Sequence, residues 1–179
     1  MKNSKALIKK YLWELIAVCV ALVLFLLTSS YFMDDAFITF VYSKNLLHDG
    51  SILYNGLAVQ GHSSFLYVIM GAMLLIPGET VFPLLVKIFS FLIWVVVIFL
   101  SGQIIHRISG SVLNKVLALC LFVSSPIILF HFQSGMETPL VYLVSLIMVY
   151  EVVRRNNHPI GTYLHRILFI GLTGMLIRP

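Results

Sequence analysis

A long apolar run lies close to the N-terminus of this chain. The core of the run, Leu15–Leu27, contains no polar residue, and a less strict apolar pattern extends over Tyr11–Met33. A helix of that length crosses the roughly 30 Å of hydrocarbon in a bilayer. Four lysines precede the run, which is typical of a first transmembrane helix with a cytoplasmic N-terminus. A signal peptide cleaved after residues 28–30 is the alternative.

The composition extends this interpretation to the whole chain. Of the 179 residues, 60% are hydrophobic and 11% are charged, whereas soluble domains carry about a quarter charged residues. A soluble protein of this size cannot cover its surface with so few polar groups. We therefore expect an all-α integral membrane protein, a polytopic bundle of transmembrane helices.

The net charge of +5 does not indicate nucleic-acid binding. The basic residues lie in short segments between apolar runs, as in cytoplasmic loops, and no basic segment with interleaved aromatic residues is present in the sequence. We expect no nucleic-acid partner. The lipid bilayer is the expected surrounding.

Five apolar stretches predict membrane spans, the last of them running into Arg178-Pro179. A Ser124-Ser125-Pro126 sequence within the third stretch predicts a kink. We expect the spans at about residues 11–33, 81–105, 113–133, 139–153 and 163–177.

Residues 34–80 predict no complete span. Ala36–Asp49 has a moderate amphipathic pattern and is followed by Gly50, which favours a short helix on the membrane surface. Phe65–Ile76 is apolar, but a helix of that length extends only about 18 Å and is too short to cross. We expect a juxtamembrane or re-entrant helix there.

The distribution of positive charge agrees with a helix at Phe65–Ile76 that does not cross. If it crossed, six of the twelve basic residues would be cytoplasmic. If it does not, nine are: Lys2, Lys5, Lys9, Lys10, Arg107, Lys115, Arg154, Arg155 and Arg166. The positive-inside rule favours the second arrangement. It predicts a multi-pass protein of the inner (cytoplasmic) membrane, with its N-terminus in the cytoplasm and residues 34–80 outside.

This topology places two acidic segments on the extracytoplasmic side. Asp34 and Asp35 directly follow the first span, and Glu137 lies in a turn, Ser134–Pro139, between two later spans. A carboxylate beside a low-dielectric layer suits a general base. Helix capping is the alternative role for the aspartates, and an ordinary turn is the alternative for Glu137. Glu14, at the cytoplasmic edge of the first span, is interpreted as an interfacial residue.

Several short motifs occur in one order along nearly the whole chain. They are Asp34-Asp35-Ala36-Phe37-Ile38-Thr39-Phe40-Val41-Tyr42, Asn45-Leu46, Gly50, Leu53-Tyr54-Asn55, Val59 with Gly61-His62-Ser63-Ser64-Phe65-Leu66, Gly135-Met136-Glu137-Thr138-Pro139-Leu140 and Ile177-Arg178-Pro179. With these motifs the sequence resembles the polytopic glycosyltransferases of the C superfamily (GT-C), and most closely their mannosyl- and arabinofuranosyltransferase-like members, which use polyprenyl-phosphate sugars.

The resemblance implies an inverting transfer of a sugar from a polyprenyl-phosphate donor to a glycan, lipid or protein acceptor. Asp34 or Asp35 would be the catalytic base. The implied substrate-binding residues are Glu137, Tyr42, Lys44, His62, Ser63, Ser64, Thr138 and Arg178. The departing phosphate needs a cation: Lys44, Arg178, or a divalent ion (Mg²⁺, Mn²⁺ or Ca²⁺) held by Asp35 and Glu137. No other cofactor is implied.

The sequence departs from the family pattern in three places. Val41 and Ser63-Ser64-Phe65 stand where family members often have Arg and Thr-Ser-Pro, and family chains continue for hundreds of residues beyond Arg-Pro. We therefore expect this chain to be the N-terminal part of such an enzyme and to transfer no sugar alone. Two other function classes remain open: a transporter or channel component that uses Asp34, Asp35 and Glu137 for a cation or proton, and a non-catalytic membrane subunit.

Overall fold

The computed structural model describes residues 2–54, 64–154 and 160–177, with the side chains of residues 2–9 and 160–164 left out of the description. The described residues form eight helices and no strand, so the all-α class expected from the apolar runs is confirmed. The helices are α1 (Lys2–Leu27), α2 (Asp34–Asp49), α3 (Phe65–Leu75), α4 (Phe82–Ser109), α5 (Val112–Ser124), α6 (Pro126–Gln133), α7 (Thr138–Arg154) and α8 (Ile160–Ile177).

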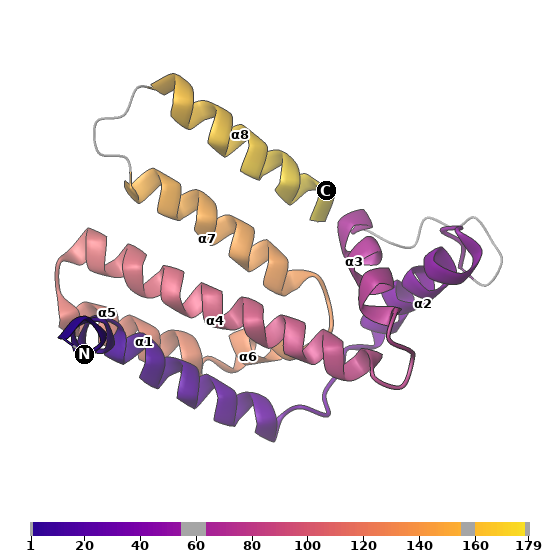
Figure 1. The fold of residues 1–179 in the computed structure, drawn as a ribbon, viewed down its shortest axis with the longest axis horizontal. Coiled ribbons are helices and arrows are strands. Elements are labelled where there is room, and N and C mark those ends of the chain that lie inside the picture. The colour runs from indigo at the N-terminus through magenta and orange to yellow at the C-terminus, as the bar shows by residue number, and fades with distance from the viewer. Residues whose placement is uncertain (1, 55–63, 155–159, 178–179) are drawn as a thin grey trace.

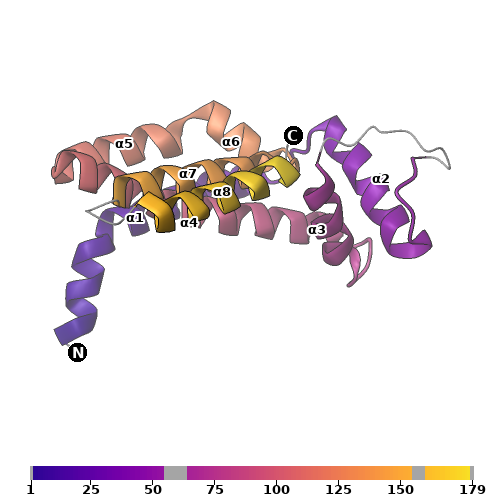
Figure 2. The ribbon, with the colours of Figure 1, turned by 90° about the horizontal axis from the view of Figure 1, so that it is seen from above.

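Four of the helices lie side by side in the order α1, α4, α7, α8 (Figure 1). Helices α5 and α6 lie across one face of this layer, where they contact α1 and α4 (Figure 2). Helices α2 and α3 pack against each other beyond one end of the layer (Figure 1). We call this the α2/α3 end; α1, α6 and α8 finish there, and α4 and α7 begin there.

Among the residues that the structure describes, two helical segments are long and apolar enough to cross a membrane, Lys10–Leu27 and Phe82–Ser109. Helices α5 and α6 together would make a third, bent by 57° where the sequence predicts a kink. The break falls at Ser125, because Pro126 has no backbone N–H to continue the helix. Two or three of the five expected spans are thus helices long enough to cross a membrane. Helix α7 has only 17 residues.

The first span ends earlier than the apolar pattern suggests. Helix α1 stops at Leu27, whereas the expected span reached residue 33. The hydroxyl of Thr28 donates a hydrogen bond of 2.9 Å to the carbonyl oxygen of Leu24 and so satisfies one of the last helical carbonyls. Apolar residues after Ser30 continue as irregular chain that leads into α2.

The core between these helices centres on Trp94 of α4. Its ring is buried and stacks on that of Phe132 from α6 with 5.2 Å between centroids, and the Phe25 ring of α1 lies 6.2 Å away. Burying aromatic rings of this size dominates the packing energy of a helical core. The contact fixes how α1, α4 and α6 approach one another next to the α2/α3 end.

Helices α2 and α3 are joined through a small-residue contact. The hydroxyl of Ser43 lies 2.9 Å from the carbonyl oxygen of Thr39 and 3.0 Å from that of Val68, and its single proton is shared between these two acceptors. A side chain at Gly71 would collide with that hydroxyl, since a Cβ there would lie 2.3 Å from Ser43 Oγ. Gly71 therefore permits the close approach of α3 to α2, and Gly50 ends α2 with a left-handed φ of 64°.

Candidate functional site

Asp34 and Asp35 form the first turn of α2, and both side chains are exposed. Met33 occupies the N-cap position and makes no side-chain capping bond. Neither aspartate is therefore the cap residue. Two carboxylates in a first helical turn complement the helix dipole, and their exposure leaves them accessible to a substrate.

The second acidic segment is a tight turn between α6 and α7. The hydroxyl of Ser134 donates to the carbonyl oxygen of His131 (2.8 Å) and accepts from the amide of Met136 (3.1 Å). Gly135 has a φ of 75°, a region that side chains disfavour. These features place Glu137 directly before α7, with only 1% of its surface exposed.

The structure brings the two acidic segments into contact. The amide of Met33 donates a hydrogen bond of 2.9 Å to the carbonyl oxygen of Ser134. Gly135 lies against Phe32 and Ala36; a Cβ on this glycine would be 2.6 Å from the Phe32 ring. Residues on both sides of Asp34 and Asp35 thus touch the turn that carries Glu137.

Tyr67 of α3 supports the same turn, and nothing in the sequence marks it. Its hydroxyl donates a hydrogen bond of 2.8 Å to the carbonyl oxygen of Gly135. Burial raises the pKa of Tyr67, and the negative charge of Glu137 raises this pKa further. The Glu137 carboxylate of the α6–α7 turn therefore interacts electrostatically with the buried Tyr67 hydroxyl of α3.

A buried lysine connects the two segments from a third direction. The ammonium of Lys87, near the start of α4, donates to the carbonyl oxygens of Tyr31 and of Gln133 (2.6 Å) and to the side-chain oxygen of Gln133 (2.8 Å). The Gln133 amide in turn donates to Phe25 O (2.6 Å) and Thr28 Oγ1 (3.0 Å). In the sequence Lys87 is noticeable only as a charge near the end of an apolar run.

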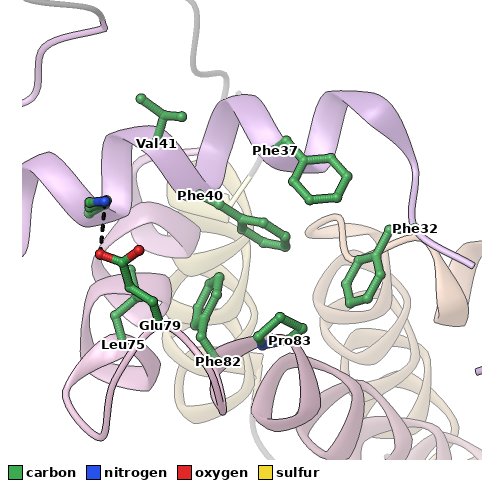
Figure 3. Close-up of a pocket in the computed structure, with 9 residues that line it drawn as sticks. Phe32, Phe37, Phe40, Val41, Leu75, Glu79, Phe82 and Pro83 are labelled. Atoms are coloured by element: carbon green, nitrogen blue, oxygen red, sulfur yellow. Dashed lines mark ion pairs between the residues drawn. The ribbon is translucent and has the colours of Figure 1, made fainter. Parts of the chain in front are cut away.

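A cavity of about 300 Å³ lies between α2, α3 and the start of α4 (Figure 3). Its lining is almost entirely apolar and rich in aromatic rings: Phe32, Phe37, Phe40, Val41, Leu75, Phe82 and Pro83, with Lys44 and Glu79 as the charged members. The rings of Phe40 and Phe82 meet edge to face at 4.8 Å. A cavity with this lining suits a hydrocarbon chain.

Lys44 and Glu79 form an ion pair at this cavity, with Nζ 2.8 Å from Oε1 (Figure 3). The hydrogen bond from Lys44 holds the pKa of Glu79 below its usual range. Both side chains are largely exposed, so the pair adds little to stability. Lys44, expected near a substrate phosphate, is thus already engaged by a carboxylate.

The other expected substrate-binding residues differ in position. Tyr42 is buried, and its ring lies 5.5 Å from that of Tyr54. Ser64 is the N-cap residue of α3; it is buried and makes no side-chain capping bond. Thr138 is the first residue of α7, next to Glu137. The remaining three, His62, Ser63 and Arg178, lie outside the described residues.

Within the described residues, no three His, Cys, Asp or Glu side chains come together as a metal-binding group. The divalent ion at Asp35 and Glu137 stays a prediction. No protein-family model, curated protein or solved structure matches this chain. The resemblance to the GT-C enzymes therefore rests on the sequence motifs alone.

Proposed function

We propose that this protein is a polytopic membrane glycosyltransferase of GT-C type or a part of one. It would transfer a sugar from a polyprenyl-phosphate donor to an extracytoplasmic glycan, lipid or protein. The observation that carries the proposal is the contact between Met33 and Ser134, because it unites the two acidic segments on which the family resemblance depends. In this proposal α7 and α8 also cross the membrane, the N-terminus is cytoplasmic, and the α2/α3 end faces outward.

In the proposed reaction, Asp34 or Asp35 removes the proton from the acceptor hydroxyl. The acceptor oxygen then attacks the anomeric carbon as the bond from that carbon to the phosphate oxygen breaks, which inverts the configuration. The exposure of both aspartates at the first turn of α2 supports this role. The Lys44 ammonium would leave the Glu79 carboxylate and bind the phosphate of the donor instead. The aromatic cavity next to Lys44 would hold the start of the polyprenyl chain.

A cation or proton carrier, the competing class, is less well supported. A carrier places its acids in a path through the helices, whereas Asp34 and Asp35 lie exposed beyond the end of α1. Ion flux in liposomes distinguishes the two classes. A proton or cation flux lost in the aspartate variants, without sugar transfer, would favour the carrier.

The direct test is transfer from radiolabelled polyprenyl-phosphate sugars in membranes. Asp34→Asn and Asp35→Asn are introduced at the chromosomal locus, so that the protein is assayed as the cell makes it. An amide has nearly the shape of a carboxylate but is no base, so one variant should lose roughly 10²–10⁴-fold in rate. Asp49→Asn, an equally exposed change at the other end of α2, is the matched control. Wild-type rates in both aspartate variants would refute the assignment.

The proposed sidedness has its own test. Single cysteines at Ser51, after α2, and at Ser109, at the end of α4, are introduced after Cys19 and Cys120 are replaced by Ser. A membrane-impermeant thiol reagent added to whole cells should label position 51 and not position 109. Labelling at position 109 and not at position 51 would show that the protein has the opposite orientation in the membrane.

A further inference from the structure

The least expected group in the described part of the chain is the buried ammonium of Lys87. Only 6% of this residue is exposed, and none of the described ion pairs involves it. A charge at this depth is costly unless it is paired or has a function. A methionine would fill similar space without that cost, so packing alone does not account for a lysine here.

All three N–H donors of the ammonium are used, and their acceptors come from two segments. One acceptor is the carbonyl oxygen of Tyr31, which lies shortly before Asp34 and Asp35 in the chain. The other two belong to Gln133, shortly before Glu137. The ammonium also lies 4.0 Å from the centre of the Phe32 ring, which packs on Gly135. One side chain of α4 thus holds the approaches to both acidic segments.

We propose that Lys87, with Gln133, is the positioning residue that sets the spacing between the Asp34/Asp35 segment and the Glu137 turn. The catalytic meaning of that spacing rests on the proposed function. The Met33 to Ser134 hydrogen bond alone is a single backbone contact that a small shift can break. The Lys87 contacts add donors fixed to a rigid helix and therefore define where both segments lie.

The chain offers a matched control for a buried lysine. Lys115 of α5 is also 6% exposed, but it pairs with Glu14 at the opposite end of the helices. The double variant Glu14→Gln/Lys115→Met removes a buried lysine without leaving its carboxylate charged. Like Lys87→Met it removes one buried ammonium, but far from the acidic segments.

The test measures the spacing directly. Nitroxide labels are attached to cysteines at Phe37, on α2, and Met136, in the α6–α7 turn, in the full chain with Cys19 and Cys120 replaced by Ser. Dipolar broadening of the EPR spectrum reports how close the labels are. We expect less broadening in Lys87→Met and wild-type broadening in Glu14→Gln/Lys115→Met. Wild-type broadening in a folded Lys87→Met variant would overturn the inference.

A second variant keeps the test decisive if Lys87→Met does not fold. Gln133→Leu leaves the lysine in place but removes its side-chain acceptor and both amide donors, so the broadening should again fall. If Gln133→Leu also retained the wild-type spectrum, Gln133 would have no part in the spacing and the proposal would fail.

Activity separates this inference from the proposed function. If the protein transfers sugar, Lys87→Met should lower kcat by roughly 10²-fold with little change in KM, because misplaced groups slow the reaction more than they weaken binding. An unchanged kcat would refute the inference about Lys87 but not the proposed function. Loss of broadening, together with no sugar transfer in membranes that contain the protein as the cell makes it, would refute the proposed function and leave the positioning role of Lys87 intact.

Discussion

The ammonium of Lys115 lies 2.9 Å from one carboxylate oxygen of Glu14 and 3.1 Å from the other, with both side chains buried. Gly102 of α4 makes room for this pair, since a Cβ there would lie 2.8 Å from Glu14 Oε1. The pair therefore joins α1 to α5 where α4 passes closest. The sequence predicts Glu14 as an interfacial residue at the edge of the first span. The structure adds that its carboxylate is buried and paired, a contact that the sequence does not reveal because Lys115 lies far away along the chain.

Removing one member of this pair should be strongly destabilising. Glu14→Gln or Lys115→Met leaves the remaining buried charge without its partner, at a cost of about 3–5 kcal/mol. The double variant Glu14→Gln/Lys115→Met buries no net charge and should lose clearly less than the two single losses combined. Thermal unfolding in detergent measures all three. Single variants as stable as the wild type would show that water reaches the pair.

Gly135 should tolerate alanine less well than Gly110 does. Both glycines have a left-handed φ, 75° and 64°, so alanine is strained at either position by roughly 1–2 kcal/mol. A Cβ at Gly135 also meets the Phe32 ring, whereas nothing lies within 4 Å at Gly110. Overpacking should add about 1–3 kcal/mol to the loss at Gly135. Equal losses in thermal unfolding would mean that the Phe32 contact is loose.

Tyr67 should make folding sensitive to alkaline pH. Its folded pKa is raised by burial and by Glu137, so its stabilising contribution is complete below the ordinary tyrosine value of about 10. This contribution is lost as the pH rises from about 10 through the raised pKa of Tyr67 in the folded protein. Tyr67→Phe should remove this part of the pH dependence, as followed by unfolding at several pH values. An identical alkaline profile in that variant would contradict the assignment.

Much of the fold could be predicted from local patterns. Long, mostly apolar runs predicted α1 and α4, Pro126 predicted the break between α5 and α6, and Gly50 predicted the end of α2. Each of these signals acts through neighbours in the sequence. The end of α1 was misplaced because apolarity continues past Leu27 and does not by itself mark where a helix stops.

The site was only partly predictable for the same reason. Asp34, Asp35 and Glu137 are conspicuous as acids in an apolar chain, and charge counting placed their segments on one side. Tyr67 and Lys87 act through distant carbonyl oxygens, Gly135 O and Tyr31 O among them, and such pairs exist only after the helices pack. Nor did the sequence show that Lys44 would be engaged by Glu79.

The Lys44 and Glu79 pair should respond to acid. Because Lys44 lowers the pKa of Glu79, the ion pair is present above the ordinary glutamate value of about 4.3 and is lost as the pH falls through the lowered value. Lys44→Met should return the Glu79 titration to its usual range. Carboxyl ¹³C NMR of the two proteins measures this difference. Superimposable titration curves would show that the pair does not form in solution.

Filling the aromatic cavity should discriminate between donors by the length of their lipid chain. Pro83 lines the cavity and is exposed, so Pro83→Trp can occupy part of the space without disturbing a buried residue. Each excluded CH₂ group costs about 0.8 kcal/mol, so displacing two of them raises the KM for a long-chain polyprenyl-phosphate sugar roughly tenfold. A donor with a truncated chain should keep its KM. Leu84→Trp, on the next residue but outside this cavity, is the matched control. If Pro83→Trp raised both KM values equally, the cavity would not be the place where the chain binds.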